Sequence, residues 1–141
     1  MMILCPHFLI DIMKNLVIIG AGGMGRTIFD VARESIGYGI EYTIKGFIDD
    51  NLSALDGFED YPPMLGTISH YLPEVDDVFT FSIGGESRRV CIEYLMERNA
   101  KFINIVHSTA RIGSNVRMGE GNVIGTSGNL SLFADQFQHL F

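Results

Sequence analysis

The chain has 141 residues, a hydrophobic fraction of 47%, a charged fraction of 19% and a formal net charge of −7 at pH 7. These values are typical of one folded domain with a short addition. The acidic balance excludes a nucleic-acid-binding surface, which needs a basic patch. The two cysteines, Cys5 and Cys91, provide neither a disulfide framework nor a metal-binding spacing. Their small number favours a reducing, cytoplasmic setting.

Residues 1–13, MMILCPHFLIDIM, are expected to be an extension that precedes the fold. The segment is apolar, but it has no basic start, and Pro6 and Asp11 interrupt it. It is also too short to cross a bilayer. We therefore interpret it as neither a signal peptide nor a membrane span, with Met13 as a candidate natural start.

From residue 14 onward, apolar strands alternate with amphipathic helices. Strands are predicted at residues 15–20, 42–49, 77–84 and 102–106, and helices at 24–36 and 86–99. The polar connection DNLSALDGFEDYPP and a short element, MLGTISHYL, lie between the second and third of these strands. Two apolar helix faces are expected, made of Met24, Ile28, Val31, Ala32 and Ile36, and of Val90, Cys91, Tyr94 and Leu95. This alternation predicts a small doubly wound α/β domain over residues 14–106, with a parallel sheet and flanking helices.

A glycine-rich turn, GAGGMG, follows the first predicted strand and opens the first predicted helix. Gly20, Gly22 and Gly25 have the G-x-G-x-x-G spacing of a dinucleotide-binding turn. In such a turn the first glycine permits the tight bend, the second lets the backbone approach a diphosphate, and the third allows close packing of helix and strand. The amides at the helix N-terminus favour an anion. The alternative is a glycine-rich turn that binds nothing.

An acidic residue that could meet a ribose is expected at the end of the second strand, where Asp49 and Asp50 both fit. A second glycine turn, Gly84-Gly85, follows a later strand and could form the opposite wall of the crevice. Glu86 would repel a phosphate there and Arg89 could offset it. Both charges are equally consistent with an ordinary solvated start of a helix.

The glycine turn alone would indicate an NAD-dependent oxidoreductase. Such an enzyme also needs a substrate domain, and only 35 residues follow Val106. The sequence contains no zinc-protease motif, nucleophile elbow or Cys–His pairing. A dehydrogenase is therefore poorly supported.

The last part of the chain carries a period of six. An apolar residue followed by a small one recurs at Ile112-Gly113, Met118-Gly119, Ile124-Gly125 and Leu130-Ser131. Hexapeptide repeats wind a parallel β-helix, in which the apolar residue points inward. Residues 107–135 are therefore predicted to start such a β-helix, and residues 136–141 form a tail outside the repeat.

The combination resembles the sugar O- and N-acyltransferases of the sialic acid O-acetyltransferase type, including the acetyltransferases that act on nucleotide-linked amino sugars. The resemblance runs from Lys14 to about Asp135 and rests on VIIGAGGMGR, GFIDD, SIGGESRR and NIVHSTARIGSNVRMGEGNVIG. It implies a small Rossmann-like domain followed by a left-handed β-helix. It also implies a homotrimer that holds acetyl-coenzyme A between neighbouring subunits.

By this resemblance, the first domain binds a UDP- or CMP-linked sugar. Gly22, Gly23 and Met24 would meet the diphosphate, and Asp49 or Asp50 would lie near the nucleoside. The family's general base is a histidine on a later coil, which deprotonates the acceptor amine or hydroxyl. Met24 and Glu86 stand where relatives often carry histidine and asparagine.

The family's catalytic histidine is expected beyond Phe141, and no residue of this chain is assigned as catalytic. His107 precedes the first coil and is interpreted as structural, while His139 lies outside the repeat. We therefore expect the chain to bind coenzyme A poorly and to be impaired in catalysis. One hypothesis is an interrupted acyltransferase that keeps its nucleotide-sugar-binding part. The alternatives are a non-catalytic binding or regulatory module and, third, an NAD-dependent oxidoreductase.

Overall fold

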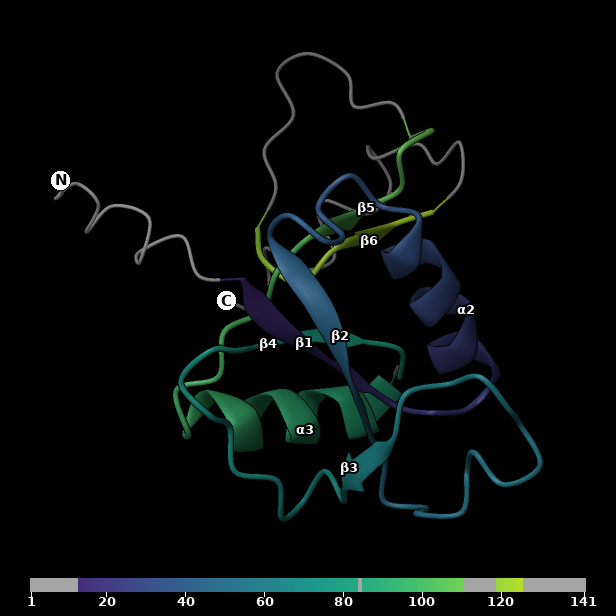
Figure 1. The fold of residues 1–141 in the computed structure, drawn as a ribbon. Helices are drawn as coiled ribbons and strands as arrows, with labels where there is room; N and C mark the ends of the chain where they lie inside the picture. The colour runs from purple at the N-terminus through teal and green to yellow at the C-terminus, as the bar shows by residue number, and fades with distance from the viewer. Residues whose placement is uncertain (1–12, 84, 111–118, 126–141) are drawn as a thin grey trace, which may run out of the picture.

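The computed structural model describes residues 13–83, 85–110 and 119–125. Its main sheet contains four parallel strands in the order β3-β2-β1-β4. The strands are β1 Lys14–Ile19, β2 Tyr42–Ile48, β3 Met64–Gly66 and β4 Asp77–Phe81. Helices α2 Gly23–Arg33 and α3 Gly85–Met96 lie on opposite faces of the sheet (Figure 1). The predicted α/β class, with a parallel sheet and flanking helices, is confirmed.

The central strand β1 shows why the sheet is covered on both faces. Its side chains alternate between the two cores: Leu16 and Ile18 pack on the α2 side, and Val17 and Ile19 on the α3 side. All four are fully buried. A continuous apolar run is therefore required here, because neither face of the strand meets water.

The helices are shorter than predicted, and three residues of the expected apolar faces are exposed. Met24 has 61% of its surface exposed, Ile36 65% and Val90 62%. Helix α2 ends at Arg33, so Ile36 leaves the helical period and lies in the turn before β2. The buried stripe of α2 is formed by Gly25, Ile28, Phe29 and Ala32. The prediction of those faces was thus wrong for these three residues and correct for Ile28, Ala32, Cys91 and Leu95, which are buried.

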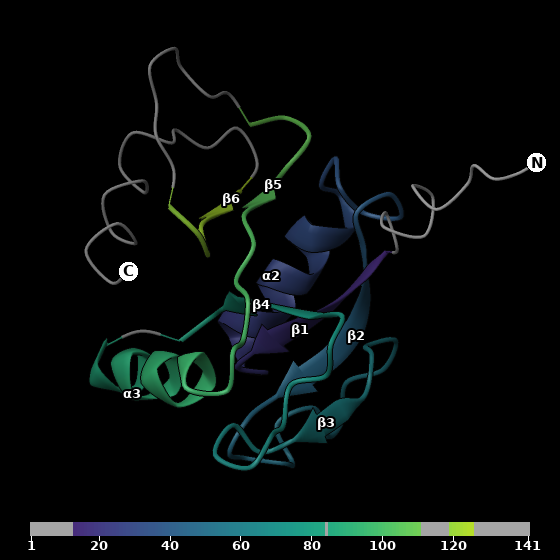
Figure 2. The ribbon, with the colours of Figure 1, turned by 90° about the vertical axis from the view of Figure 1, so that its left-hand side faces the viewer.

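The segment predicted as a strand at residues 102–106 is divided between two sheets. Phe102 makes an isolated parallel bridge with Phe79 of β4, and the Phe79 amide donates to the Lys101 carbonyl at 2.8 Å. The chain then leaves the main sheet. Only Ile105–Val106 forms strand β5, and it pairs with β6, Val123–Ile124 (Figure 2).

Strands β5 and β6 lie where the predicted β-helix would begin. They are parallel, and Ile105 pairs with Val123, 18 residues further along the chain. This spacing equals three of the predicted hexapeptides. Ile124 is fully buried, as an inward-pointing repeat residue should be. The repeat pairs that begin at Ile112, Met118 and Leu130 lie wholly or partly outside the described residues.

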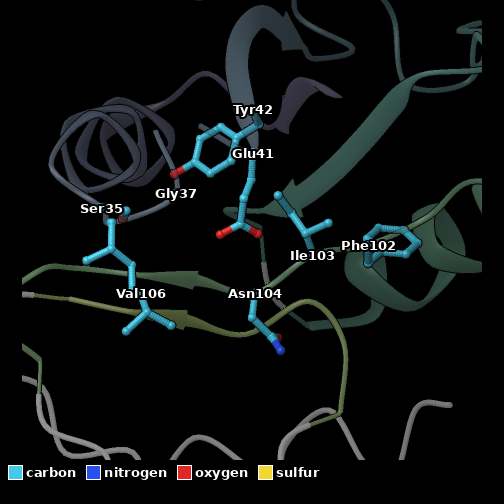
Figure 3. A pocket seen from close by; sticks show the side chains of 9 residues that line it. Ser35, Gly37, Glu41, Tyr42, Phe102, Ile103, Asn104 and Val106 are labelled. Atoms are coloured by element: carbon cyan, nitrogen blue, oxygen red, sulfur yellow. The ribbon is translucent and has the colours of Figure 1, made fainter. Parts of the chain in front are cut away.

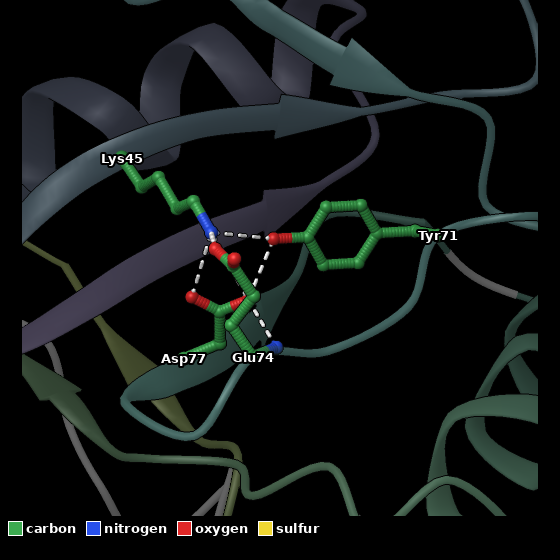
Figure 4. Close-up of polar contacts among 4 residues, drawn as sticks. All are labelled: Lys45, Tyr71, Glu74 and Asp77. Atoms are coloured by element: carbon green, nitrogen blue, oxygen red, sulfur yellow. Dashed lines mark hydrogen bonds and ion pairs between the residues drawn. The ribbon is translucent and has the colours of Figure 1, made fainter.

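A partly buried polar network around Asp77 closes the amino-terminal end of the sheet (Figure 4). Lys45 is the extra residue of a bulge in β2, because Leu16 pairs with Ile44 and Val17 with Gly46. Its ammonium group donates to the Asp77 carboxylate at 3.0 Å and to the Tyr71 hydroxyl at 2.9 Å, and also to Glu74.

Both titratable donors of this network have raised pKa values. Burial opposes the charge of Lys45, but its hydrogen bonds to Glu74, Tyr71 and Asp77 outweigh that effect and raise its pKa above the ordinary value. Burial and the hydrogen bond to Asp77 raise the pKa of Tyr71 to about 12. Lys45 therefore stays charged and Tyr71 stays protonated at neutral pH.

Candidate functional site

The predicted site residues gather where the carboxyl ends of β1, β2 and β4 meet. The chain builds β2 and β3 on one side of β1 and then crosses to place β4 on the other side. The order therefore reverses between β1 and β4, and open α/β sheets bind their ligands at such a switch point. The glycine turn after β1 occupies this position.

Gly20 and Gly25 are required by the geometry of the turn itself. Gly20 has φ = +100°, and a Cβ there would lie 2.3 Å from the Ser82 hydroxyl oxygen. A Cβ on Gly25 would lie 2.0 Å from the Gly20 carbonyl oxygen. The tight bend and the close approach of helix and strand, both predicted from the spacing, are thus present.

Gly22 and Gly23 face open space instead. Gly22 is the N-cap of α2 with φ = −78°, and nothing lies within 4 Å of a Cβ built on it. No side chain caps this helix, and its first turn contains no acidic residue. Met24 follows and is exposed. Helix amides that carry partial positive charge therefore point toward an accessible surface, where an anion is favoured.

The two candidate acids occupy different places. Asp49 lies beside the glycine turn: its carboxylate accepts the Ala21 amide at 2.8 Å and the Asn51 amide at 2.8 Å. Asp50 instead accepts the amides of Ile68 and Ser69 at 3.0 and 3.3 Å, in the turn after β3. The structure therefore brings Asp49, and not Asp50, to the glycine turn.

The second glycine turn is described in part. Gly84 lies outside the described residues, and Gly85 is the first residue of α3. Glu86 and Arg89 of that helix are both exposed. Among the described residues, Arg89 takes part in no ion pair.

Two polar residues of the turn were missed by the sequence analysis. Ser82, just after β4, donates to the carbonyls of Ile19 and Gly20 at 2.7 and 3.0 Å and so joins the ends of β1 and β4. Arg26 donates to the Ala21 carbonyl at 3.2 Å. In the sequence, Ser82 could be noticed only as a serine that ends an apolar strand, and Arg26 only as an arginine directly after the third glycine. Neither feature by itself identifies a residue of the site.

His107, which precedes the first predicted coil, makes the side-chain contacts of a structural residue. His107 is 5% exposed, and its Nδ1 accepts the Thr109 amide at 3.1 Å. Its Nε2 therefore carries the proton and donates to the Glu34 carboxylate at 2.7 Å. Both ring nitrogens are thus engaged. Among the described residues, no group of three or more His, Cys, Asp or Glu side chains could hold a metal ion.

Cys91 lies on α3 and is buried in the core. Burial raises the pKa of its thiol, and the carboxylates of Asp50 and Asp49 raise it further. The thiol therefore stays protonated at neutral pH, as is usual for an unreactive thiol in a protein core.

A cavity of about 350 Å³ lies at the opposite end of the sheet from the glycine turn, between the turn that follows α2 and the segment that leads into β5 (Figure 3). It is lined by residues that include Ser35, Glu41, Ile103, Asn104 and Val106. None of the predicted site residues contributes to it.

In the described part of the chain, no helix is long and apolar enough to cross a membrane.

Comparison with known proteins agrees with this arrangement. The family described as the PglD N-terminal domain matches residues 15–95, more than half of the chain. The UDP-N-acetylbacillosamine N-acetyltransferase of Bacillus subtilis (strain 168) is 30% identical over 117 residues, which cover 79% of this chain and 51% of that protein.

Two solved structures of the acetyltransferase domain of PglB from Neisseria gonorrhoeae FA1090 are also similar. One, in complex with acetyl coenzyme A, has a TM-score of 0.63 and 26% identity over 81% of this chain and 54% of that one. The other has a TM-score of 0.64 and 26% identity over 80% and 54%. The chain spans about half the length of these relatives. It belongs to the PglD N-terminal domain family.

Proposed function

We propose that the glycine turn binds the diphosphate of a nucleotide-linked sugar, with Gly20, Gly22, Gly23, Met24 and Gly25 around the phosphates. The observation that carries this proposal is the uncapped N-terminus of α2, which opens at Gly22 onto accessible surface. Asp49 would lie near the nucleoside, since β2 delivers it to the edge of the turn. A UDP-linked sugar is favoured over a CMP-linked one, because the curated relative is named for a UDP-linked substrate.

On the far side of the switch point, we propose that Gly85 and Arg89, together with Gly84, form the second wall of the site. Arg89 is exposed on the first half of α3 and could reach a ligand from there. Asp50 is assigned a structural role in this proposal, because its carboxylate is engaged by the turn after β3.

The reaction proposed for the family is acetyl transfer from acetyl-CoA to an amine or hydroxyl of the sugar. In the described part of the chain, the coil contributes only two strands of two residues each, and Ile105 and Ile124 are fully buried. These residues do not form a site that fits the coenzyme. We therefore propose that the described domain supplies substrate binding.

Finer features of the family remain proposals for this chain. They are the left-handed sense of the β-helix, the homotrimer, a cytoplasmic location, and membership of the sialic acid O-acetyltransferase type. Division into a nucleotide-sugar-binding domain at residues 14–106, a β-helix at residues 107–135 and a tail at residues 136–141 belongs to the same proposal. The engaged ring of His107 argues that this residue is not the general base.

Calorimetric titration tests the proposed function. UDP-N-acetylglucosamine, as a probe of the UDP-sugar class, is expected to bind, and NAD is expected to bind at least 10 times more weakly, on the order of 1.4 kcal/mol. Asp49 at the end of β2 would suit a ribose of either ligand, which is why the two must be compared. Preference for NAD would replace the proposal by the oxidoreductase alternative.

A substitution at Gly22 separates ligand binding from folding. Because nothing lies within 4 Å of a Cβ at this position, Gly22→Ala should change the free energy of unfolding by about 1 kcal/mol or less. The added methyl group stands where the diphosphate would approach, so affinity for the UDP-sugar should fall roughly 10-fold or more. Unchanged affinity in the folded variant would show that the phosphates bind elsewhere.

A further inference from the structure

Arg26 places a cation directly on the glycine turn. Its Nη1 donates to the Ala21 carbonyl, and its Nη2 lies 3.9 Å from the position of a Cβ on Gly23. The guanidinium therefore reaches back from α2 to the residues that begin the helix. Among the described residues, Arg26 takes part in no ion pair.

The guanidinium is held in this position by an aromatic side chain from another element. Its Cζ atom lies 3.9 Å from the centroid of the Phe58 ring, which comes from the connection between β2 and β3. Phe58 is 47% exposed, so one face of this pair is open to solvent. A cation stacked at this distance is attracted by the ring, and an arginine also keeps its planar donors free at the edges.

Phe58 is itself connected to the core. Its ring contacts Tyr61 at a centroid distance of 6.4 Å, and Tyr61 packs against Phe29 at 5.3 Å and Phe47 at 6.3 Å. Phe47 is fully buried in β2. The connection after β2 is thus anchored to the sheet, and it positions Phe58 over the helix N-terminus. The cation is therefore preorganised.

The charges around the turn show why a cation matters here. The chain carries a net charge of −7, and Asp49 places a carboxylate on the Ala21 amide. A helix N-terminus supplies only about half of a positive charge, whereas a diphosphate carries more than one negative charge. Arg26 donates to the carbonyl oxygen of the same residue, Ala21, which puts the guanidinium and the helix amides around one accessible surface.

Resting on the proposed function, we propose that Arg26 is a binding residue for the diphosphate and that Phe58 holds its guanidinium in place. The donors of Arg26 not used by Ala21 suit two phosphate oxygens. Because Phe58 belongs to the connection at residues 51–63, the position of that connection affects binding of the diphosphate at the glycine turn. The affinity for the phosphates comes from a fixed side-chain cation as well as from backbone amides.

The experiment compares UDP binding by the full chain and three variants in calorimetric titrations over a range of NaCl concentrations. Arg26→Met should weaken UDP binding by about 10- to 100-fold, the effect of a bidentate charge-assisted contact. It should also reduce the dependence of affinity on salt, because one cation is lost. Phe58→Leu should weaken binding by a few-fold, since the guanidinium loses its support.

Arg33→Met is the matched control. Arg33 lies on the same helix, stacks on Phe29 at 4.6 Å and pairs with Asp30, but it lies about 10 Å further along the helix axis. The variant has the same net charge as Arg26→Met and should bind UDP within about twofold of the wild type. Equal losses in both variants would indicate a long-range charge effect and would overturn the proposal.

The remaining outcomes are also decisive. UDP binding by the wild type with unchanged affinity in Arg26→Met overturns this inference and leaves the proposed function intact. Absence of UDP-sugar and UDP binding by the folded wild type overturns both. Thermal denaturation checks that each variant is folded. If Arg26→Met is unfolded, Arg26→Lys decides: it keeps the charge without the planar donors, so intermediate affinity supports the proposal and wild-type affinity overturns it.

Discussion

Replacing Gly25 by alanine is expected to lower the free energy of unfolding by about 3 kcal/mol or more. The added Cβ would lie 2.0 Å from the Gly20 carbonyl oxygen, and that oxygen belongs to backbone that cannot turn away like a flexible side chain. The start of α2 would have to separate from β1, which would also expose the core around Ile28 and Phe29. Denaturant-induced unfolding, followed by far-ultraviolet circular dichroism, measures the effect.

Gly23→Ala provides the matched control, because it adds the same methyl group two residues earlier. The nearest atom to a Cβ at Gly23 is the Arg26 Nη2 at 3.9 Å, an ordinary contact. Alanine is also favoured over glycine in a helix by about 1 kcal/mol. The control should therefore be as stable as the wild type or more stable. Similar losses in the two variants would mean that helix and strand do not approach each other as closely as described.

The second large effect is expected at Lys45. In Lys45→Met the fully buried Asp77 carboxylate loses its cation, while it keeps the Tyr71 hydroxyl at 2.6 Å and the Glu74 amide at 2.9 Å. Removing one partner of a buried ion pair costs about 3–5 kcal/mol. Lys45 is 23% exposed, so we expect about 2–3 kcal/mol after allowance for solvent screening. Urea unfolding at neutral pH measures the loss.

Lys14→Met tests whether the loss comes from burial of the pair. Lys14 pairs with Asp76 at 3.5 Å, and the two side chains are 45% and 35% exposed. An exposed pair of this kind contributes about 0.5 kcal/mol or less.

A double variant provides a second test. Asp77→Asn combined with Lys45→Met should lower the free energy of unfolding by less than the sum of the two single changes, because the amide leaves no buried charge. Additive effects, or equal losses from Lys14→Met and Lys45→Met, would contradict the described network.

The parts of the site that follow from local spacing could be predicted from the sequence. Gly25 is needed because of its contact with Gly20, five residues earlier, and Gly20 is needed because of its positive φ, so the motif fixes their roles. The apolar runs of β1 and β4 also predict a parallel sheet without knowledge of their partners. The choice between Asp49 and Asp50 could not be made, because it depends on which carboxylate meets the turn and which meets the segment after β3.

The other missed features depend on contacts between segments that are distant in the sequence. Arg26 gains its position from Phe58, 32 residues away, and Ser82 from the turn, 62 residues away. Lys45 reaches Asp77 only because a bulge displaces it in β2. Helix periodicity misplaced Met24, whose side chain lies in the first turn of α2 and is exposed. Tertiary packing decided each of these cases.

The division of residues 101–106 between two sheets has a mechanical consequence. A repeating coil is a solenoid, and its first turn needs a cap that covers the open strand edge and fixes the register. For the proposed β-helix, the α/β domain would be that cap: Phe79 holds the segment by the Lys101 carbonyl, Ile105 is buried against α2, and Glu34 binds His107. Slippage of such a coil by one hexapeptide would pull Phe102 out of the core. The sheet would therefore serve as the template on which the first rung of the proposed solenoid is laid down.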